Sequence, residues 1–234
     1  MANKVAVKAF SLLLVVLMAG SAVMMLSGGL TGGGGQESTI KPVEGAGVVM
    51  DNGSRLFQNL PIPAIGPADA RLQVYIFYSL FCPHCGNEVR NNLDYYVSLA
   101  KEGVARIYFV DFPQTGAQNL HAGLRCIARN GGPFLEVLQD LYAIILDEGR
   151  LPTMEDLRDI ASRYNASIDE ACINEELPII SNIVTISYSS YKVSGTPTIV
   201  VYDTVTDKGY MAVGEQSREE LEKFINDVLS GSAG

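Results

Sequence analysis

The chain has 234 residues, of which 47% are hydrophobic and 18% are charged, so it can hold one ordinary globular domain with an insertion. Its net charge of −9 argues against nucleic-acid binding, because such proteins need basic patches to meet the phosphates. An acidic surface otherwise serves solubility and says little about the substrate.

The first predicted element is a membrane segment. Lys4 and Lys8 precede residues 9–26, an uncharged and mostly apolar stretch. Its length lies between the core of a signal peptide and a spanning helix, which needs about 20 residues with a lower limit near 17. We favour an uncleaved signal anchor that crosses the cell membrane once and leaves the body outside the cytoplasm. The alternative is cleavage, which gives a secreted or periplasmic protein. Residues 1–35 are therefore assigned to the anchor and a glycine-rich tether.

The body begins with a lead-in, residues 36–70, which contains several prolines and glycines and one expected short strand at 55–58. Residues 72–78 form a continuous apolar run, which is typical of a central strand covered on both faces. Apolar residues at helical spacing then predict a helix that Gly103 ends, and residues 106–110 predict the next strand. Strand, helix and strand in this order form a right-handed βαβ unit.

The apolar pattern then becomes helical over residues 117–193. Several helices are expected there, each recognised by its apolar spacing or by its starting signal. They are a helix near residues 120–128, one opened by Pro133, one capped by Thr153, a short one with the capping box Ser167–Glu170, and one at 179–191.

Strands return at residues 198–202 and 210–213, and Ser217 is the expected cap of a final amphipathic helix. The order of elements predicts an α/β domain made of residues 71–116 and 194–232, with a central mixed sheet flanked by helices. The helical segment between these two parts is an inserted subdomain.

The most informative feature is the motif Cys82-Pro83-His84-Cys85, which closely follows the predicted central strand. Two residues between the cysteines allow one helical turn to close a disulfide, and free N–H groups at a helix start stabilise a thiolate. Pro83 suits the first turn because it has no N–H to leave unpaired, and His84 adds a protonatable positive neighbour. A C-x-x-C between a buried strand and a helix is where a thioredoxin-like fold keeps a redox dithiol.

The motif has two other interpretations. A structural zinc site needs four nitrogen or sulfur ligands, and the chain has no second C-x-x-C or H-x-H pair. The only other histidine, His121, is interpreted as a polar residue on a helix face. The motif would otherwise be two unrelated buried thiols. We therefore expect a redox dithiol with no metal and no cofactor.

The remaining cysteines, Cys126 and Cys172, both fall in the predicted insertion. Four cysteines allow three pairings, and the short spacing of the motif favours Cys82 with Cys85, which leaves Cys126 with Cys172. A structural disulfide is the preferred interpretation of this second pair. Inert buried thiols and a second redox relay are the alternatives.

The chain resembles the DsbA family of exported thiol:disulfide oxidoreductases over roughly residues 55–232. The resemblance is carried by the segment from Phe77 to Cys85 with its Pro-His dipeptide, by Arg125-Cys126-Ile127-Ala128, by Gly132 and Phe134, and by Gly195-Thr196-Pro197-Thr198. It implies a thioredoxin-like fold with an inserted helical subdomain.

The resemblance also implies roles for individual residues. Cys82 would be the exposed nucleophile and Cys85 the more buried resolving thiol. His84 would lower the pKa of Cys82 and so make the disulfide oxidising. Pro197 would follow a cis peptide bond, and Thr196 and Pro197 would offer backbone groups to an extended substrate chain.

One position departs from the family pattern. Family members carry a buried acid on the strand before the motif, and the corresponding residue here is Ile76. Tyr75, Tyr78 or a water molecule are conceivable substitutes for proton transfer to Cys85.

The function implied by the resemblance is that of a membrane-tethered monomer that donates its disulfide to exported protein or peptide thiols. A membrane partner of the DsbB or VKOR type would re-oxidise it. A reductase or isomerase fed by a membrane electron donor is the first alternative, although the stretch from Gly35 to Arg71 looks too short for a dimerisation domain. The second alternative is a copper-binding module that uses Cys82, His84 and Cys85 as soft ligands.

Overall fold

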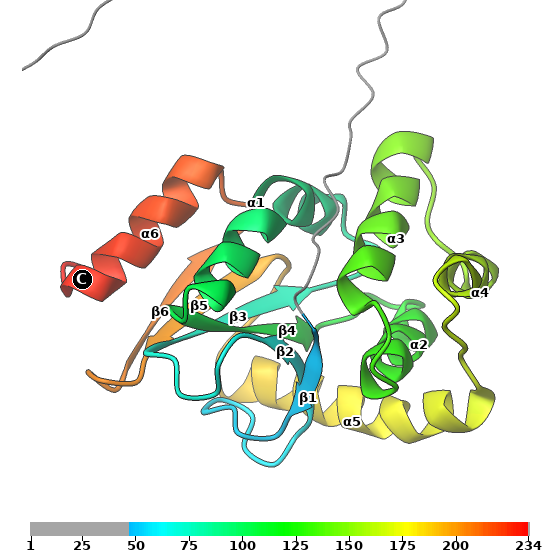
Figure 1. The fold of residues 1–234 in the computed structure, drawn as a ribbon, viewed down its shortest axis with the longest axis horizontal. Helices are drawn as coiled ribbons and strands as arrows, with labels where there is room; N and C mark the ends of the chain where they lie inside the picture. The colour runs from blue at the N-terminus through cyan, green and yellow to red at the C-terminus, as the bar shows by residue number, and fades with distance from the viewer. Residues whose placement is uncertain (1–46, 234) are drawn as a thin grey trace, which may run out of the picture. The chain divides into compact units, whose positions relative to one another are not determined.

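The computed structural model describes residues 47–233 of the chain. They form a six-stranded mixed sheet in the order β1-β2-β4-β3-β5-β6, with helices on both faces (Figure 1). The predicted anchor and tether and the first part of the lead-in lie outside the described residues. In the part of the chain that the structure describes, no helix is long and apolar enough to cross a membrane.

The centre of the sheet is the predicted βαβ unit. Strand β3, Leu72–Tyr78, lies parallel to β4, Ala105–Asp111, and helix α1, Pro83–Lys101, connects the two. Every residue of both strands is buried, as a continuous apolar run predicts for a central strand. The motif therefore stands where the most buried strand meets the first turn of a long helix.

Antiparallel strands extend the sheet on both sides. Strand β5, Thr198–Asp203, pairs with β3, and β6, Lys208–Val213, forms one edge. Strand β2, Ile62–Ile65, pairs with β4, and β1, Val49–Asp51, forms the other edge.

The strand predicted at residues 55–58 is wrong, because that segment is a loop between β1 and β2. Its N–H groups bond to side chains of β3 instead of to a neighbouring strand. Arg55 N donates to the Tyr75 hydroxyl and to Gln73 Oε1, both at 3.1 Å, and Leu56 N also donates to the Tyr75 hydroxyl. The segment satisfies its backbone donors without sheet pairing.

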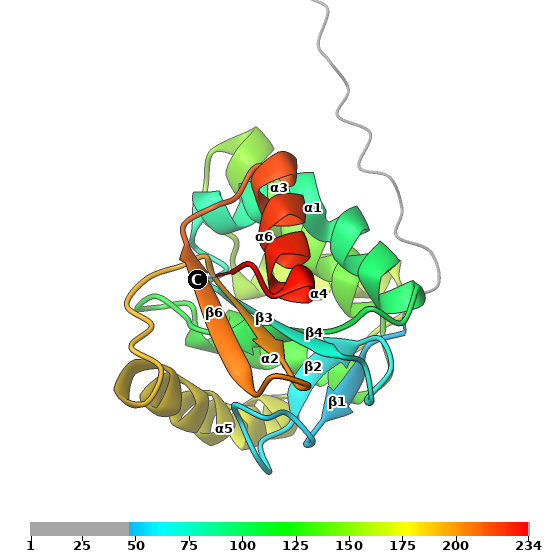
Figure 2. The same ribbon diagram turned by 90° about the vertical axis from the view of Figure 1, so that its left-hand side faces the viewer.

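The helices divide between the two faces of the sheet (Figure 2). Helices α1 and α6, Arg218–Ser230, cover one face, and α5, Glu170–Ser189, covers the other (Figures 1 and 2). Helices α2, Gln118–Arg129, α3, Phe134–Glu148, and α4, Met154–Arg163, pack against one another. The predicted caps at Thr153 and Ser217 are confirmed.

Helix α5 corrects two predictions. The capping box at Ser167 is wrong, because the N-cap is Asp169, whose side chain accepts a hydrogen bond from Cys172 N. The short helix and the helix at 179–191 are one continuous helix with Pro178 inside it. A proline removes one backbone hydrogen bond, but burial of apolar side chains before and after it holds this helix together.

Alternation along β3 decides which side chains can reach the motif. Val74, Ile76 and Tyr78 point into the core that also contains Cys82 and Cys85. Tyr75 and Phe77 point into a second core on the face covered by α5. Tyr75 is therefore separated from the dithiol by the sheet itself, which removes it as a candidate for proton transfer to Cys85.

Candidate active site

The two motif sulfurs lie at the start of α1 in the reduced state. Cys82 is the N-cap of the helix, and Pro83 occupies the first helical position. Cys85 N donates to Cys82 Sγ at 3.3 Å, so the first sulfur receives one of the free amides of the helix start. Only 3% of Cys82 and 1% of Cys85 is exposed, which makes Cys82 the more accessible of two nearly buried thiols.

The two cysteines differ sharply in acidity. A hydrogen bond from the Cys85 thiol lowers the pKa of Cys82 to about 6, with further contributions from Thr196 and the backbone amides of Cys85 and His84, and against the effect of burial. Burial and the neighbouring Cys82 sulfur raise the pKa of Cys85 well above its usual value. At neutral pH, Cys82 is mainly a thiolate nucleophile and Cys85 remains a thiol.

Thr196 and Pro197 face this dithiol from the start of β5. The Thr196–Pro197 peptide bond is cis, and the Thr196 carbonyl oxygen lies 3.3 Å from Cys82 Sγ. Pro197 O accepts a hydrogen bond from Gly214 N at 2.8 Å, which ties this loop to the end of β6. Both predicted substrate-binding residues therefore lie next to Cys82 in the structure, although Cys82 and Thr196 are 114 residues apart in the sequence.

The His84 side chain contacts the loop after β6. Its Nδ1 lies 2.8 Å from Glu215 Oε2, and Asn87 Nδ2 donates to the same oxygen at 3.1 Å. The hydrogen bond and the charge of Glu215 raise the pKa of His84. The His84 side chain therefore acts on Cys82 through its charge, while its backbone amide hydrogen-bonds the sulfur.

Glu88 holds the loop that carries Glu215. This carboxylate is buried, and it accepts hydrogen bonds from Asn92 Nδ2 at 2.9 Å, from the Tyr96 hydroxyl at 2.8 Å and from Gln216 N at 2.7 Å. Burial raises its pKa. Sequence reasoning missed Glu88, because its partner Gln216 is 128 residues away in the sequence.

A buried histidine supports the loop just before Cys82. His121 Nε2 accepts a hydrogen bond from Leu80 N at 3.0 Å, so the ring carries its proton on Nδ1 and donates it to Asp111 Oδ1 at 2.8 Å. The Tyr78 hydroxyl donates to the same Asp111 oxygen at 3.0 Å. His121 lies on a helix as predicted, but the face that carries it is fully buried.

Arg125 neutralises this network. Its guanidinium donates to Asp111 Oδ2 at 2.8 Å, to Glu176 Oε2 at 2.6 Å and to Pro61 O at 2.7 Å, and the side chain is fully buried. Burial alone would raise the pKa of Asp111, but the charge of Arg125 and the hydrogen bond from His121 lower it. Asp111 therefore remains an ion inside the core.

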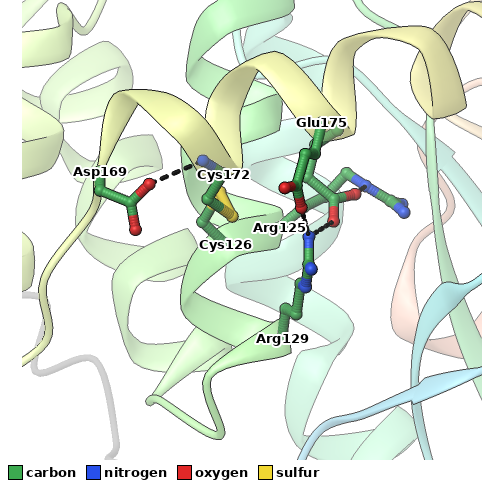
Figure 3. Close-up of a disulfide and its surroundings, with 7 residues drawn as sticks. Arg125, Cys126, Arg129, Asp169, Cys172 and Glu175 are labelled. Atoms are coloured by element: carbon green, nitrogen blue, oxygen red, sulfur yellow. Dashed lines mark hydrogen bonds and ion pairs between the residues drawn. A yellow bond between two sulfur atoms is a disulfide. The ribbon is translucent and has the colours of Figure 1, made fainter.

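A disulfide joins α2 to α5 beside Arg125 (Figure 3). Cys126 and Cys172 are bonded to each other, 46 positions apart in sequence. At the start of α5, the Asp169 side chain accepts a hydrogen bond from Cys172 N (Figure 3). An ion pair between Arg129 and Glu175 also links α2 to α5 (Figure 3), with 2.6 Å between Arg129 Nη1 and Glu175 Oε2. In residues 47–233, no three His, Cys, Asp or Glu side chains are grouped as metal ligands.

A reduced C-x-x-C pair at a helix start, facing a cis X-Pro bond beside a mixed sheet, defines the class of thioredoxin-fold dithiol proteins. A family model described as Thioredoxin matches residues 59–227, and the chain belongs to this family. No curated protein matches the sequence significantly.

Solved structures share the fold at low sequence identity. Wolbachia pipientis alpha-DsbA1 is 16% identical, with a TM-score of 0.60 over 72% of this chain and 90% of that one. Chlamydia trachomatis DsbA is 18% identical, with a TM-score of 0.59 over 74% and 94%. A thioredoxin-like oxidoreductase from Silicibacter pomeroyi is 15% identical, with a TM-score of 0.55 over 72% and 92%. These likenesses confirm the predicted α/β thioredoxin-like fold, and at the level of the fold they bear out the resemblance to DsbA proteins.

Proposed function

We propose that this protein is a thiol:disulfide oxidoreductase that introduces disulfides into exported proteins through Cys82 and Cys85. The observation that carries the proposal is the asymmetry of the pair, in which Cys82 has a pKa of about 6 while the pKa of the buried Cys85 is raised. Dithiol–disulfide exchange requires a thiolate that can both attack and leave, here Cys82, and a second thiol that stays protonated until it resolves the mixed disulfide, here Cys85. The structures of the same fold that are described as DsbA proteins or as an oxidoreductase support this reading.

The same asymmetry favours disulfide donation. A thiolate exists only in the reduced enzyme, so every interaction that stabilises it makes the disulfide more oxidising. A Cys82 pKa of about 6, compared with about 8.5 for a free thiol, stabilises the reduced form by about 1.4 kcal/mol at pH 7. For a two-electron couple this corresponds to about 30 mV.

The proposed location is outside the cytoplasm, with the body held at the cell membrane by the N-terminal segment. Lys4, Lys8 and the apolar residues 9–26 support the anchor, with cleavage and release as the alternative. The Cys126–Cys172 disulfide supports an oxidising compartment, where such bonds persist. The proposed substrates are thiols of exported proteins or peptides, and the proposed oxidant is a membrane partner of the DsbB or VKOR type that serves a monomeric enzyme.

A membrane-tethered reductase or isomerase is the second candidate. The direction of the Cys82 pKa shift favours donation, but its moderate size is the observation on the side of the reductase. The Cys82 pKa of about 6 lies nearer to that of reducing thioredoxin, about 7, than to that of DsbA, about 3.5. The copper-binding module has less support, because His84 Nδ1 is engaged with Glu215.

The reduction potential of the Cys82–Cys85 pair distinguishes these functions. The full-length protein is equilibrated with glutathione buffers, and the fraction of oxidised pair is measured by trapping free thiols. A potential well above about −180 mV supports the disulfide donor. A potential near about −270 mV contradicts it and supports the reductase. Retained stoichiometric copper without any exchange activity would instead support the metal-binding module.

A further inference from the structure

The buried sulfur of Cys85 poses a chemical problem. Whenever the Cys82–Cys85 bond breaks or forms, Cys85 carries negative charge, and it does so in an apolar core at 1% exposure. Ile76 points into that same core from the position where family members carry an acid. The apolar Ile76 side chain gives the charge no partner, which leaves it the hydrogen bonds of the Ser79 backbone and the Thr196 side chain. A buried charge with few partners is costly.

Three tyrosines near the motif differ in what their hydroxyls can do. Tyr75 lies on the opposite face of the sheet. Tyr78 is in the same core as Cys85, but its hydroxyl donates to the ionised Asp111 at 3.0 Å, a strong acceptor that holds it in place. Tyr142 on α3 is also in this core, and its hydroxyl has only a neutral acceptor, Ser79 O, at 3.0 Å.

Tyr142 packs in the same core cluster as the two cysteines of the motif. Its hydroxyl donates to Ser79 O, the carbonyl oxygen that also accepts from Cys82 N, so the hydroxyl lies beside the dithiol. Its ring packs on the first turn of α1 at Gly86. Gly86, the residue after Cys85, makes this approach possible, because a β-carbon there would lie 3.2 Å from Tyr142 Cδ1 and 3.1 Å from Leu146. The absence of a side chain at position 86 thus lets the phenol ring pack closely against the turn that carries Cys85.

We propose that Tyr142 is a catalytic residue whose hydroxyl donates a hydrogen bond to the charged Cys85 sulfur, in place of the acid that Ile76 replaces. This inference rests on the proposed dithiol exchange through Cys82 and Cys85.

The hydroxyl can change acceptor at little cost. Ser79 O also accepts a hydrogen bond from Cys82 N at 3.0 Å, so it keeps a partner when Tyr142 turns to the sulfur. A hydrogen bond to an ionised acceptor is about twice as strong as one to a neutral acceptor. Burial raises the pKa of Tyr142 well above its ordinary value, so the phenol keeps its proton and acts as a donor only.

The proposed step is the attack of a substrate thiolate on Cys82 Sγ of the oxidised enzyme. A bond forms between the substrate sulfur and Cys82, the Cys82–Cys85 bond breaks, and its electron pair leaves on Cys85. The Tyr142 hydroxyl stabilises this thiolate until a proton from water neutralises it. A second thiolate of the substrate then attacks the substrate's sulfur in the mixed disulfide and releases Cys82 as a thiolate. The substrate loses two electrons, and the enzyme gains them.

The test is the rate at which reduced glutathione attacks the oxidised full-length protein, measured by stopped flow in the native chain and in Tyr142→Phe. The variant keeps the ring and loses only the hydroxyl. Hydrogen bonds to charged groups are strong enough for the expected fall to be about tenfold or more. The matched control is Tyr108→Phe, which removes a hydroxyl bound to Asp51 on the other face of the sheet and should leave the rate unchanged.

A second readout separates catalysis from a shift of the loop. Alkylation of the reduced enzyme by iodoacetamide as a function of pH reports the thiolate of Cys82, and its midpoint should stay near pH 6 in Tyr142→Phe. If the hydroxyl only held the Ser79 carbonyl, both the midpoint and the attack rate would move. A 3,5-difluorotyrosine at position 142 serves as the third variant, because its more acidic hydroxyl is a better donor and should accelerate the attack.

The outcomes are distinct. A rate in Tyr142→Phe within about twofold of the native rate overturns the inference, and so does a parallel shift of the alkylation midpoint. Should Tyr142→Phe fail to fold, a difluorotyrosine variant that is no faster than the native chain overturns it equally. If glutathione does not react with the native disulfide at all, the proposed function itself fails, and not merely the role of Tyr142.

Discussion

The acidity of Cys82 makes the stability of the reduced enzyme depend on pH. The pKa of Cys82 is about 6 in the folded protein and about 8.5 in an unfolded chain. Because folding lowers this pKa, the stabilisation is complete above about pH 8.5 and is lost as the pH falls through 6. The oxidised enzyme has no thiolate at this position and lacks the effect.

The magnitude follows from the two pKa values. We compare the free energies of unfolding of the reduced and the oxidised form. The contribution of Cys82 to their difference should be close to zero at pH 5, about 1.4 kcal/mol at pH 7 and about 2.5 kcal/mol at pH 8, in favour of the reduced form. Titrations that both redox states share, such as that of the His84–Glu215 pair, largely cancel in this difference.

The assay is urea unfolding of both redox states at pH 5, 6, 7 and 8. A Cys126→Ala, Cys172→Ala background ensures that the reductant acts only on the motif. Cys82→Ser in the same background is the control, because without the thiolate its stability should follow the pH dependence of the oxidised form. A difference between the redox states that changes by less than about 0.5 kcal/mol from pH 5 to 8 would refute the lowered pKa.

Three further changes test the structure around the site. Arg125→Met leaves two buried carboxylates without their cation and should cost about 3–5 kcal/mol in urea unfolding, whereas Arg158→Ala removes an exposed ion pair and should cost at most about 1 kcal/mol. Replacing Cys126 and Cys172 by alanine should cost about 2–4 kcal/mol while the rate of glutathione attack is kept. Gly66→Ala should cost at least about 1–3 kcal/mol, because φ is +93° and a β-carbon would lie 2.5 Å from the carbonyl oxygen of Ala105.

Each of these three predictions can be contradicted by one result. Equal losses for the buried and the exposed arginine would mean that the buried network is not a compensated charge cluster. A slower glutathione reaction after removal of the second disulfide would show that this bond acts on the dithiol as well as on stability. An unchanged melting temperature for the glycine variant would show that the backbone at position 66 relaxes easily.

The elements and motifs that could be predicted from the sequence are those that a short stretch of neighbouring residues determines. The apolar run of β3, the C-x-x-C spacing and the caps of α4 and α6 are all readable within a few neighbouring residues. Strands β1 and β2 were missed because they are short, and Pro63 in the middle of β2 reads as a break in a strand.

The polar residues around the site were missed for a different reason. A single acid, arginine or histidine in a helical pattern gives the same signal whether it faces solvent or a buried partner. Glu88 meets the loop of Gln216, and Arg125 meets Glu176, across long separations in sequence. Only the fold decides that these pairs meet, so periodicity alone cannot distinguish them from surface charges.

The inserted helices support the candidate site, because two of them bind the loop that precedes Cys82. His121 from α2 accepts a hydrogen bond from Leu80 N, and Tyr142 from α3 donates to Ser79 O, the carbonyl that also receives Cys82 N. Arg125, also on α2, keeps Asp111 ionised beside His121. Buried backbone groups of this loop need hydrogen-bond partners, and the inserted helices supply two of them. The disulfide joins α2, which carries His121 and Arg125, to α5.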